Sequence, residues 1–289
     1  MHLPQDRYAD VQNHRVRYWE EGQGAPIVLV HGLGNSVLNW RKNLEPLGKR
    51  FRAIALDLPG HGLSDMPRGW FDLPHGAGFL AAFLDELGIP AAHFVGNSMG
   101  GILSLELALT QPERVASLTL ADSAGLGRQV AAGLRIATLP LVGEYFQRPS
   151  LKRVRGLVRW MLYDPRHVDE EELPIRLGYL ERRGSAQALI RYLRTGVSPS
   201  GQRPATRRDA RLASLTQPTL IAWGAQDPLF PSSHARDAAK KIPRAQLHIL
   251  DRCGHWPQYE YPDEFNRLLT DFVSSVPFPV ARPPTVTVP

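Results

Sequence analysis

The sequence is poor in cysteine and in long apolar runs. Cys253 is the single cysteine among 289 residues, so an internal disulfide and a cysteine-rich metal site are both excluded. No apolar run approaches the ~20 residues that a membrane-spanning helix needs, and we expect no integral membrane segment. The amino terminus lacks the basic start, apolar stretch and small-residue cleavage site of a secretory signal. We therefore expect a cytoplasmic protein, although a mature secreted chain would have the same features.

Positive charge is concentrated in one part of the chain. The net charge is +6, and the segment from Gly125 to Ala213 holds seventeen Lys or Arg residues against eight acids. Such a block could attract nucleic acid, an anionic membrane surface or acidic substrates. Acids are interleaved with the basic residues, and no nucleic-acid-binding motif accompanies them. We expect a solvated helical face with many salt bridges, and no nucleic-acid partner.

Short apolar runs alternate with segments whose apolar residues have helical spacing. This alternation predicts an α/β fold in which a mostly parallel central sheet is flanked by helices. Strands are expected at 14–19, 27–30, 51–56, 93–95, 115–120, 219–223 and 246–250, and helices at 73–87, 103–109, 232–241 and 263–273.

The strand signal disappears between residues 125 and 213, where Arg-rich helical patterns such as 151–162 replace it. We interpret 124–213 as a helical cap inserted into an α/β core that consists of 1–123 and 214–275. The remaining segment, 276–289, is rich in proline and poor in large apolar side chains, so we expect a loose tail.

The segment Gly96-Asn97-Ser98-Met99-Gly100 lies where a predicted strand meets a predicted helix. Gly-x-Ser-x-Gly in this context is a nucleophile elbow, a strained turn that exposes the serine hydroxyl at the carboxyl edge of the sheet. The flanking glycines allow neighbouring backbone to pass where a Cβ would clash. Ser98 is therefore the candidate nucleophile.

A serine nucleophile needs a histidine as base and an acid that orients the histidine. In this architecture the chain order is serine, acid, histidine. Asp227 follows the strand at 219–223, and His255 follows the strand at 246–250, so this order is present. Asp122, which also follows a strand, is an alternative acid.

Other polar residues have simpler interpretations. We expect His31 and His61 to form structural hydrogen bonds, and Asp57 to stabilise its own turn. Cys253 is expected to be a small packing residue.

An acyl transfer also needs donors for the oxyanion of its tetrahedral intermediate. The backbone N–H of Met99 is one candidate, and the glycine-containing loop His31-Gly-Leu-Gly34 offers the N–H of Leu33 as the second. Chemistry of this kind requires neither a metal nor an organic cofactor.

Taken together, these motifs resemble the α/β-hydrolase superfamily. The resemblance is carried by His31–Gly34, Asp57–Ser64, Gly96–Gly101, Trp223–Asp227 and Gly254–Trp256. Within the superfamily the elbow is similar to that of carbon–carbon bond hydrolases that act on meta-cleavage products of aromatic degradation. The loop HGLGNS and the segment DLPGHGLSD are instead similar to general esterases and their relatives.

Four pocket residues follow from the resemblance to the carbon–carbon bond hydrolases. Asn39 matches an asparagine of the oxyanion loop, Asn97 is the asparagine of the elbow, and Trp256 follows the histidine. Arg176 resembles the cap arginine that holds a substrate carboxylate in that family.

These features predict a serine hydrolase that cleaves a carboxylic ester through an acyl-enzyme. Carbon–carbon cleavage of a 2-hydroxy-6-oxo-dienoate is the alternative, and a hydrolase-fold receptor and an acyltransferase are two further ones. We expect a small-molecule ester or related acyl compound as the partner, and the chain could form a homo-oligomer.

Overall fold

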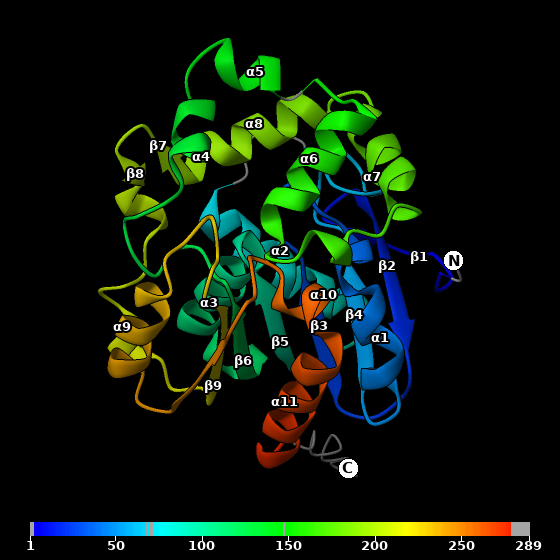
Figure 1. Ribbon diagram of the computed structural model, residues 1–289. Coiled ribbons are helices and arrows are strands. Elements are labelled where there is room, and N and C mark those ends of the chain that lie inside the picture. Colours follow the sequence, from blue (N-terminus) through cyan, green and yellow to red (C-terminus); the bar gives the residue numbers. More distant parts are fainter. Residues whose placement is uncertain (1–2, 68, 70–71, 147, 279–289) are drawn as a thin grey trace, which may run out of the picture.

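The computed structural model describes residues 3–67, 69, 72–146 and 148–278. An eight-stranded sheet runs through its centre, in the order β1-β2-β4-β3-β5-β6-β9-β10 (Figure 1). The strands are β1 Arg7–Val11, β2 His14–Glu21, β3 Pro26–Val30, β4 Arg52–Leu56, β5 Ala92–Asn97, β6 Val115–Ala121, β9 Thr219–Gly224 and β10 Ala245–Leu250. The pairs β1/β2 and β2/β4 are antiparallel, and the other pairs are parallel. The predicted α/β fold with a mostly parallel sheet is confirmed.

Helices cover both faces of the sheet because side chains in a strand point alternately to its two faces. In β3, Val28 and Val30 belong to one apolar core, whereas Ile27 and Leu29 belong to the other. The first core includes side chains of α2 Leu73–Glu86, α3 Met99–Thr110 and α9 Ser233–Lys241. The second includes side chains of α1 Arg41–Gly48 and α11 Pro262–Ser275. A strand buried on both faces reads as a continuous apolar run, which is why β3 was visible in the sequence.

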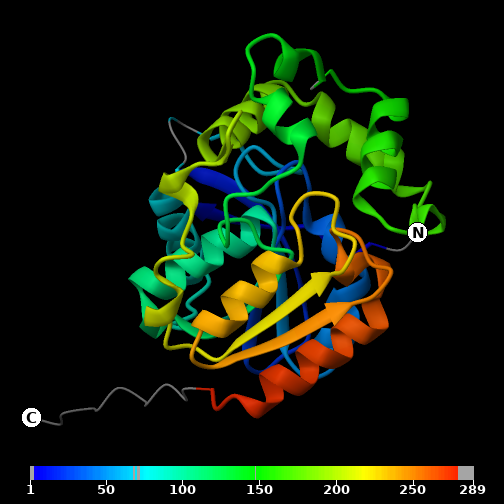
Figure 2. The same ribbon diagram turned by 60° about the vertical axis from the view of Figure 1, so that its left-hand side comes forward.

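The described residues of the segment interpreted as the cap form five α-helices and a short hairpin, besides short 3-10 turns. These are α4 Ala132–Ala137, α5 Val142–Phe146, α6 Leu151–Met161, α7 Glu172–Glu181, α8 Ser185–Gly196, β7 Val197–Ser198 and β8 Gly201–Gln202. In both views the helices of this segment lie together over one end of the sheet (Figures 1 and 2). The short elements that remain are η1 Val37–Trp40, η2 Pro112–Arg114, η3 Pro165–His167, η4 Pro204–Thr206, η5 Leu212–Ser214 and α10 Pro257–Glu260.

Several elements were absent from the sequence-based prediction. Strand β1 pairs with β2 through the two-residue turn Gln12-Asn13, in which both residues have positive φ, 51° and 61°. A turn of this kind matches the twist of the flanking strands and needs no glycine when asparagine occupies it. Helix α1 and the β7/β8 hairpin were also missed. Most of the expected tail, 279–289, lies outside the described residues.

No helix in the described part of the chain is long and apolar enough to cross a membrane.

Candidate active site

Ser98 occupies the turn between β5 and α3, in a backbone conformation that a non-glycine residue rarely adopts. Its φ is 55° and its ψ is −116°. The turn is tight: a Cβ on Gly96 would lie 2.3 Å from the Gly100 carbonyl oxygen, and a Cβ on Gly100 would lie 2.1 Å from that of Val30. Neither position can therefore carry a side chain without a shift of backbone. The elbow geometry that the spacing predicted is present.

Asp227 and His255 come together at the same edge of the sheet, after β9 and β10. Nδ1 of His255 lies 3.0 Å from Oδ2 of Asp227, and both side chains are almost completely buried. The other oxygen, Oδ1, accepts from the Leu229 amide at 2.7 Å. Because the carboxylate faces Nδ1, the Nδ1–H tautomer is favoured, in which Nε2 can act as the base. Ser98 and His255 line one cavity.

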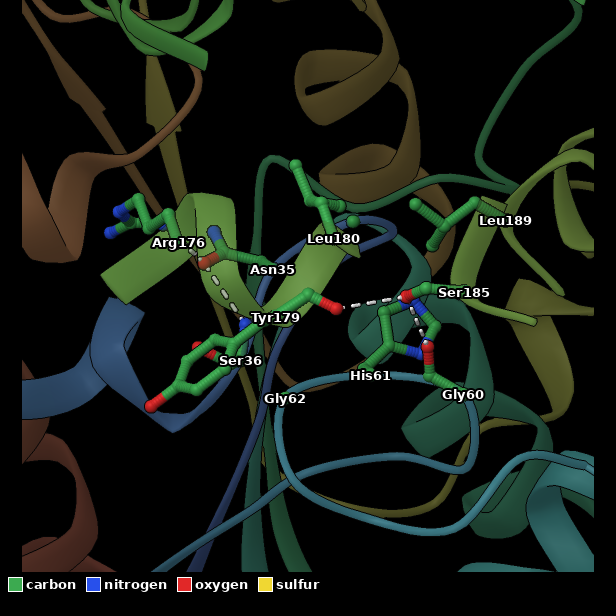
Figure 3. A pocket seen from close by; sticks show the side chains of 11 residues that line it. Asn35, Ser36, Gly60, His61, Gly62, Arg176, Tyr179, Leu180, Ser185 and Leu189 are labelled. Carbon is green, nitrogen blue, oxygen red and sulfur yellow. Dashed lines mark hydrogen bonds between the residues drawn. The ribbon is translucent and has the colours of Figure 1, made fainter. Parts of the chain in front are cut away.

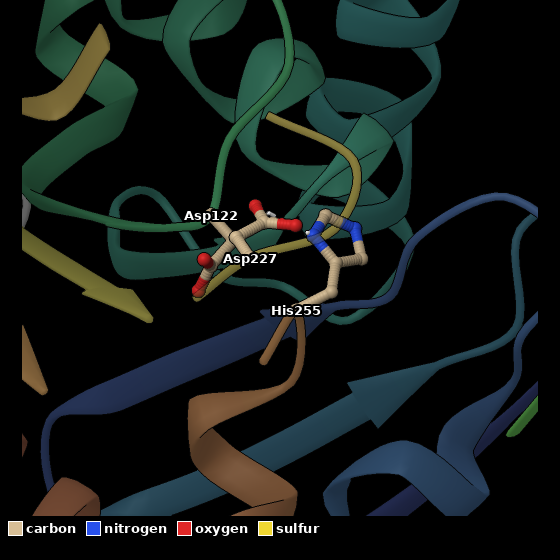
Figure 4. A group of neighbouring side chains, drawn as sticks. All are labelled: Asp122, Asp227 and His255. Carbon is tan, nitrogen blue, oxygen red and sulfur yellow. Dashed lines mark hydrogen bonds and ion pairs between the residues drawn. The ribbon is translucent and has the colours of Figure 1, made fainter. Parts of the chain in front are cut away.

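Figure 4 shows Asp122, the alternative acid, next to Asp227. Its Oδ1 accepts from the Gly224 amide at 3.0 Å, and no described hydrogen bond joins it to His255. Complete burial, followed by the proximity of Asp227, raises the pKa of Asp122 well above its usual range. Two close carboxyls cannot both ionise easily, so Asp122 is the one that retains a proton and Asp227 the one that faces histidine.

These three side chains also form the one group of potential metal ligands found in the described part of the chain. Hydrogen bonds already account for the arrangement of the three side chains, because His255 is hydrogen-bonded to Asp227 and Asp122 accepts a hydrogen bond from the Gly224 amide.

Leu33 and Met99, whose amides are expected to bind an oxyanion, both line the cavity. No described residue accepts a hydrogen bond from either amide. The loop of Leu33 passes very close to the nucleophile: a Cβ on Gly32 would lie 3.0 Å from Cβ of Ser98. The two amides are thus available beside Ser98.

Two of the four expected pocket residues have other positions. Nδ2 of Asn97 donates to the carbonyl oxygens of Ala121 and His255, each at 3.1 Å, so this side chain holds the histidine loop against the end of β6. Asn39 is fully buried on η1 and is not among the residues that line the cavity. The asparagine that meets the cap arginine is instead Asn35, whose Oδ1 accepts from Nη1 of Arg176 at 2.7 Å.

Arg176 and Trp256 do line the cavity. The guanidinium carbon of Arg176 lies 5.4 Å from the centre of the Trp256 ring. Nε and Nη2 of Arg176 donate to Oε2 of Glu172 at 3.0 and 2.7 Å. Figure 3 shows Arg176 beside Asn35 in a small niche next to the main cavity. The arginine is therefore fixed in position by a buried carboxylate, a pairing that the sequence analysis did not foresee.

Glu260 is a second buried acid that sequence reasoning missed. Its carboxylate accepts from the amides of Gly254 at 2.6 Å, Tyr163 at 2.8 Å and Asp164 at 3.3 Å. The His255 amide donates to the Met161 carbonyl oxygen at 2.7 Å. Burial raises the pKa of Glu260. This carboxyl ties the histidine loop to the end of α6, and the only sequence signal was its position five residues after His255.

Other predicted structural roles are visible. Nε2 of His31 accepts from the Leu58 amide at 3.0 Å, and burial lowers the pKa of His31 to about 4. Asp57 accepts from Arg17, Val37 and Leu63 at 2.7 to 2.8 Å, which stabilises its turn. Cys253 is buried, and its burial raises the pKa of the thiol, as suits a packing residue.

The cavity has a volume of about 740 Å³, and its lining is mainly apolar. Below, it is bounded by Ser98, His255 and the loop of Leu33. Above, it is bounded by side chains of the cap helices, which include Leu134, Val154, Leu157, Val158, Trp160, Leu189 and Leu193. A volume of this size accommodates a drug-sized organic molecule.

Residues 27–268 match the model of the alpha/beta hydrolase family. The chain belongs to this family. It is a hydrolase by fold and by relationship. It is 31% identical over 275 residues to a 2-hydroxy-6-oxo-6-phenylhexa-2,4-dienoate hydrolase of Comamonas testosteroni, and the match covers 91% of this chain and 93% of that one.

Two further similarities are informative. The hydrolase is 36% identical over 264 residues to a dihydrolipoyllysine-residue acetyltransferase component of the acetoin cleaving system of Cupriavidus necator, covering 91% of this chain and 67% of that one. Among solved structures, a meta-cleavage product hydrolase from Pseudomonas fluorescens superposes with a TM-score of 0.79 at 29% identity, covering 93% of this chain and 97% of that one.

Proposed function

We propose that this hydrolase cleaves a carbon–carbon bond beside the ketone of a 2-hydroxy-6-oxo-dienoate-type acid, which was the alternative in the sequence analysis. The observation that carries the proposal is that Arg176 lines the same cavity as Ser98 and His255. The similarity to dienoate hydrolases over nine-tenths of the chain supports the same substrate class.

In this proposal Arg176 holds the substrate carboxylate. A guanidinium has five N–H donors, and three of them are used by Glu172 and Asn35, so two remain for a ligand. The cationic groups Arg41, Lys42 and Arg176 lie around the anionic Glu172 and Asp169, which gives this cluster a formal charge of +1. An anionic group is therefore attracted to this wall of the cavity.

The reaction uses the triad and the two amides. Ser98 Oγ adds to the keto carbon while His255 takes its proton, and the amides of Leu33 and Met99 stabilise the oxyanion. Before this addition the 2-hydroxydienoate takes its 2-oxo tautomeric form, in which C5 gains a proton and the 2-hydroxyl group loses one, because a C5 atom in a double bond could not delocalise the electron pair. When the tetrahedral intermediate collapses, the C5–C6 bond breaks, its electron pair delocalises through the enone onto the 2-oxo oxygen, and the resulting dienolate takes a proton. Water then hydrolyses the acyl-Ser98 ester, with His255 as base, and releases a carboxylic acid.

Ester hydrolysis is the second candidate, and the apolar cavity favours it. Glu172 offsets the charge of Arg176, and the rest of the lining can accept an acyl chain without a carboxylate. The triad and the two amides would act in the same way on an ester. The leaving group would then be an alkoxide, which needs no conjugated system to accept its electron pair. Acyl transfer to an acceptor other than water would also use them, and product analysis separates transfer from hydrolysis.

Arg176→Gln, with Arg183→Gln as its matched control, tests whether Arg176 binds the substrate carboxylate. Arg183 is exposed on the same segment and carries the same charge. We expect the Arg176 variant to lose about 10- to 150-fold in kcat/KM for a dienoate, the worth of a charged hydrogen bond, and to change little on a neutral ester. Arg176→Lys should recover part of the loss.

Equal losses on both substrates would show a structural role for Arg176 and contradict the proposal. Unchanged dienoate kinetics would contradict it as well.

A further inference from the structure

The exposed large hydrophobic side chains gather in one segment of the cap. In the part of the chain that the structure describes, ten such side chains are exposed, and eight of them lie between residues 136 and 163. We call residues 132–163, with α4, α5 and α6, the cap apex; Figure 1 shows these helices at the end of the molecule away from α11. Its exposed hydrophobic residues are Ile136, Leu139, Leu141, Tyr145, Leu151, Leu157, Trp160 and Tyr163. Exposed apolar side chains gathered in one segment are typical of an interaction surface.

The cap apex is also strongly basic. It contains six basic residues and one acid, Glu144, so its formal charge is +5, whereas the whole chain carries +6. The six are Arg135, Arg148, Lys152, Arg153, Arg155 and Arg159. A salt-bridged face was expected from the sequence, and Arg155 does pair with Glu170 outside the apex. Exposed apolar groups among so many cations were not expected.

Several residues of this surface also line the active-site cavity. Ile136, Leu157 and Trp160 are exposed, and all three also line the cavity that contains Ser98. Arg148 and Arg153 are part of the same lining. A molecule that enters the cavity at this point must pass the cap apex.

We propose that the cap apex docks onto an anionic phospholipid surface and that a substrate with a large apolar part enters the cavity from that surface. Aliphatic and aromatic side chains insert into the boundary between headgroups and acyl chains, while Arg and Lys contact the phosphates. The docking stands independently, and only the delivery of substrate rests on the proposed function.

Charge decides between this partner and a second copy of the chain. Two apices of charge +5 would repel each other on contact, whereas an anionic surface attracts each of them. Nucleic acid would satisfy the cations but would leave the leucine side chains without an apolar partner. A lipid surface is the partner that satisfies both kinds of group.

Vesicle co-sedimentation of the full chain tests the docking without turnover. The probes are vesicles of phosphatidylcholine alone and of phosphatidylcholine mixed with phosphatidylglycerol, at low and high salt. We expect at least about tenfold stronger binding to the anionic vesicles, and a decrease with salt.

Two double variants change the apex without touching the cavity lining. Lys152→Glu with Arg159→Glu removes cationic groups, and its control is Lys49→Glu with Arg50→Glu in the exposed turn before β4. Leu139→Ser with Leu141→Asn removes apolar groups, and its control is Leu247→Ser on β10. Each apex variant should bind anionic vesicles at least about tenfold more weakly than its control, and thermal unfolding should verify that all variants fold.

Three results would overturn the docking proposal: no binding of the wild type to anionic vesicles at low salt, equal binding by apex and control variants, or a dimer in solution that the Leu139/Leu141 variant dissociates. Loss of the proposed reaction with vesicle binding intact would count against the proposed function alone.

Discussion

Asp122 gives a prediction in which two variants of one buried carboxyl behave differently. The side chain is fully buried, and its Oδ1 accepts from the Gly224 amide at 3.0 Å. A carboxyl that retains its proton beside Asp227 resembles an asparagine in shape and in hydrogen bonding. Asp122→Asn should therefore cost less than about 1 kcal/mol, whereas Asp122→Ala leaves the Gly224 amide unsatisfied and should cost about 1–3 kcal/mol.

The same group makes stability depend on pH. Because the folded-state pKa of Asp122 is raised, the folded protein binds more protons than the unfolded chain between the two pKa values. Its stabilising contribution is present below the unfolded-state pKa and is lost as pH rises through the folded-state value. The slope reaches about 1.4 kcal/mol per pH unit. Asp227, Glu260 and Cys253 are the titratable groups that influence it.

Urea unfolding at a series of pH values measures this effect. Asp122→Asn should gain stability relative to wild type as pH rises above the usual carboxyl range, and the control Asp237→Asn, which changes an exposed carboxylate, should follow the wild-type slope. If the free energies of unfolding of Asp122→Asn and wild type depend on pH in the same way, or if the asparagine and alanine variants lose equal stability, the inference that Asp122 is protonated is refuted.

Two further predictions concern the elbow and the histidine loop. Gly96→Ala places a Cβ 2.3 Å from the Gly100 carbonyl oxygen, so it should destabilise the fold by about 1–3 kcal/mol and lower kcat. Its control in urea unfolding and steady-state kinetics is Gly178→Ala, because nothing lies within 4 Å of a Cβ at Gly178 and this residue does not line the cavity. Stability of the Gly96 variant equal to that control would be the contrary result. Glu260→Gln replaces a carboxylate oxygen that accepts from backbone amides with an NH2 donor, so it should lower the free energy of unfolding by about 1–3 kcal/mol and reduce kcat. The control Glu264→Gln changes a half-exposed carboxylate in α11 and should alter neither quantity. Wild-type kcat in the Glu260 variant would show that this carboxyl does not position the histidine loop.

The parts of the site that local sequence predicted are those that local geometry fixes. The elbow is a five-residue turn whose glycines are required by backbone contacts within a few residues or across one strand pair. Asp227 and Asp122 both follow strands, so the pattern could offer both as acids and could not choose between them. The choice came from tertiary contact, since Asp227 lies 3.0 Å from Nδ1 of His255.

The pocket was less predictable because its contacts join segments far apart in the chain. Asn35 and Asn39 lie in the same loop region, and only the turn of η1 decides that Asn35 meets Arg176 while Asn39 is buried elsewhere. Glu172 lies in a run of acids that reads as solvated surface, but it is fully buried against Arg176 and Tyr259. The sequence pattern contains no signal for which member of such a run points inward.

The most direct test of the central claim compares kcat/KM for a 2-hydroxy-6-oxo-dienoate with kcat/KM for p-nitrophenyl esters from acetate to dodecanoate, with Ser98→Ala as the control. The proposed function predicts that dienoate cleavage dominates and that it disappears, together with any esterase activity, in Ser98→Ala. Strong Ser98-dependent ester turnover with little dienoate cleavage would contradict the carbon–carbon assignment and leave an esterase. Dienoate cleavage that persists in Ser98→Ala would contradict the role of the nucleophile itself.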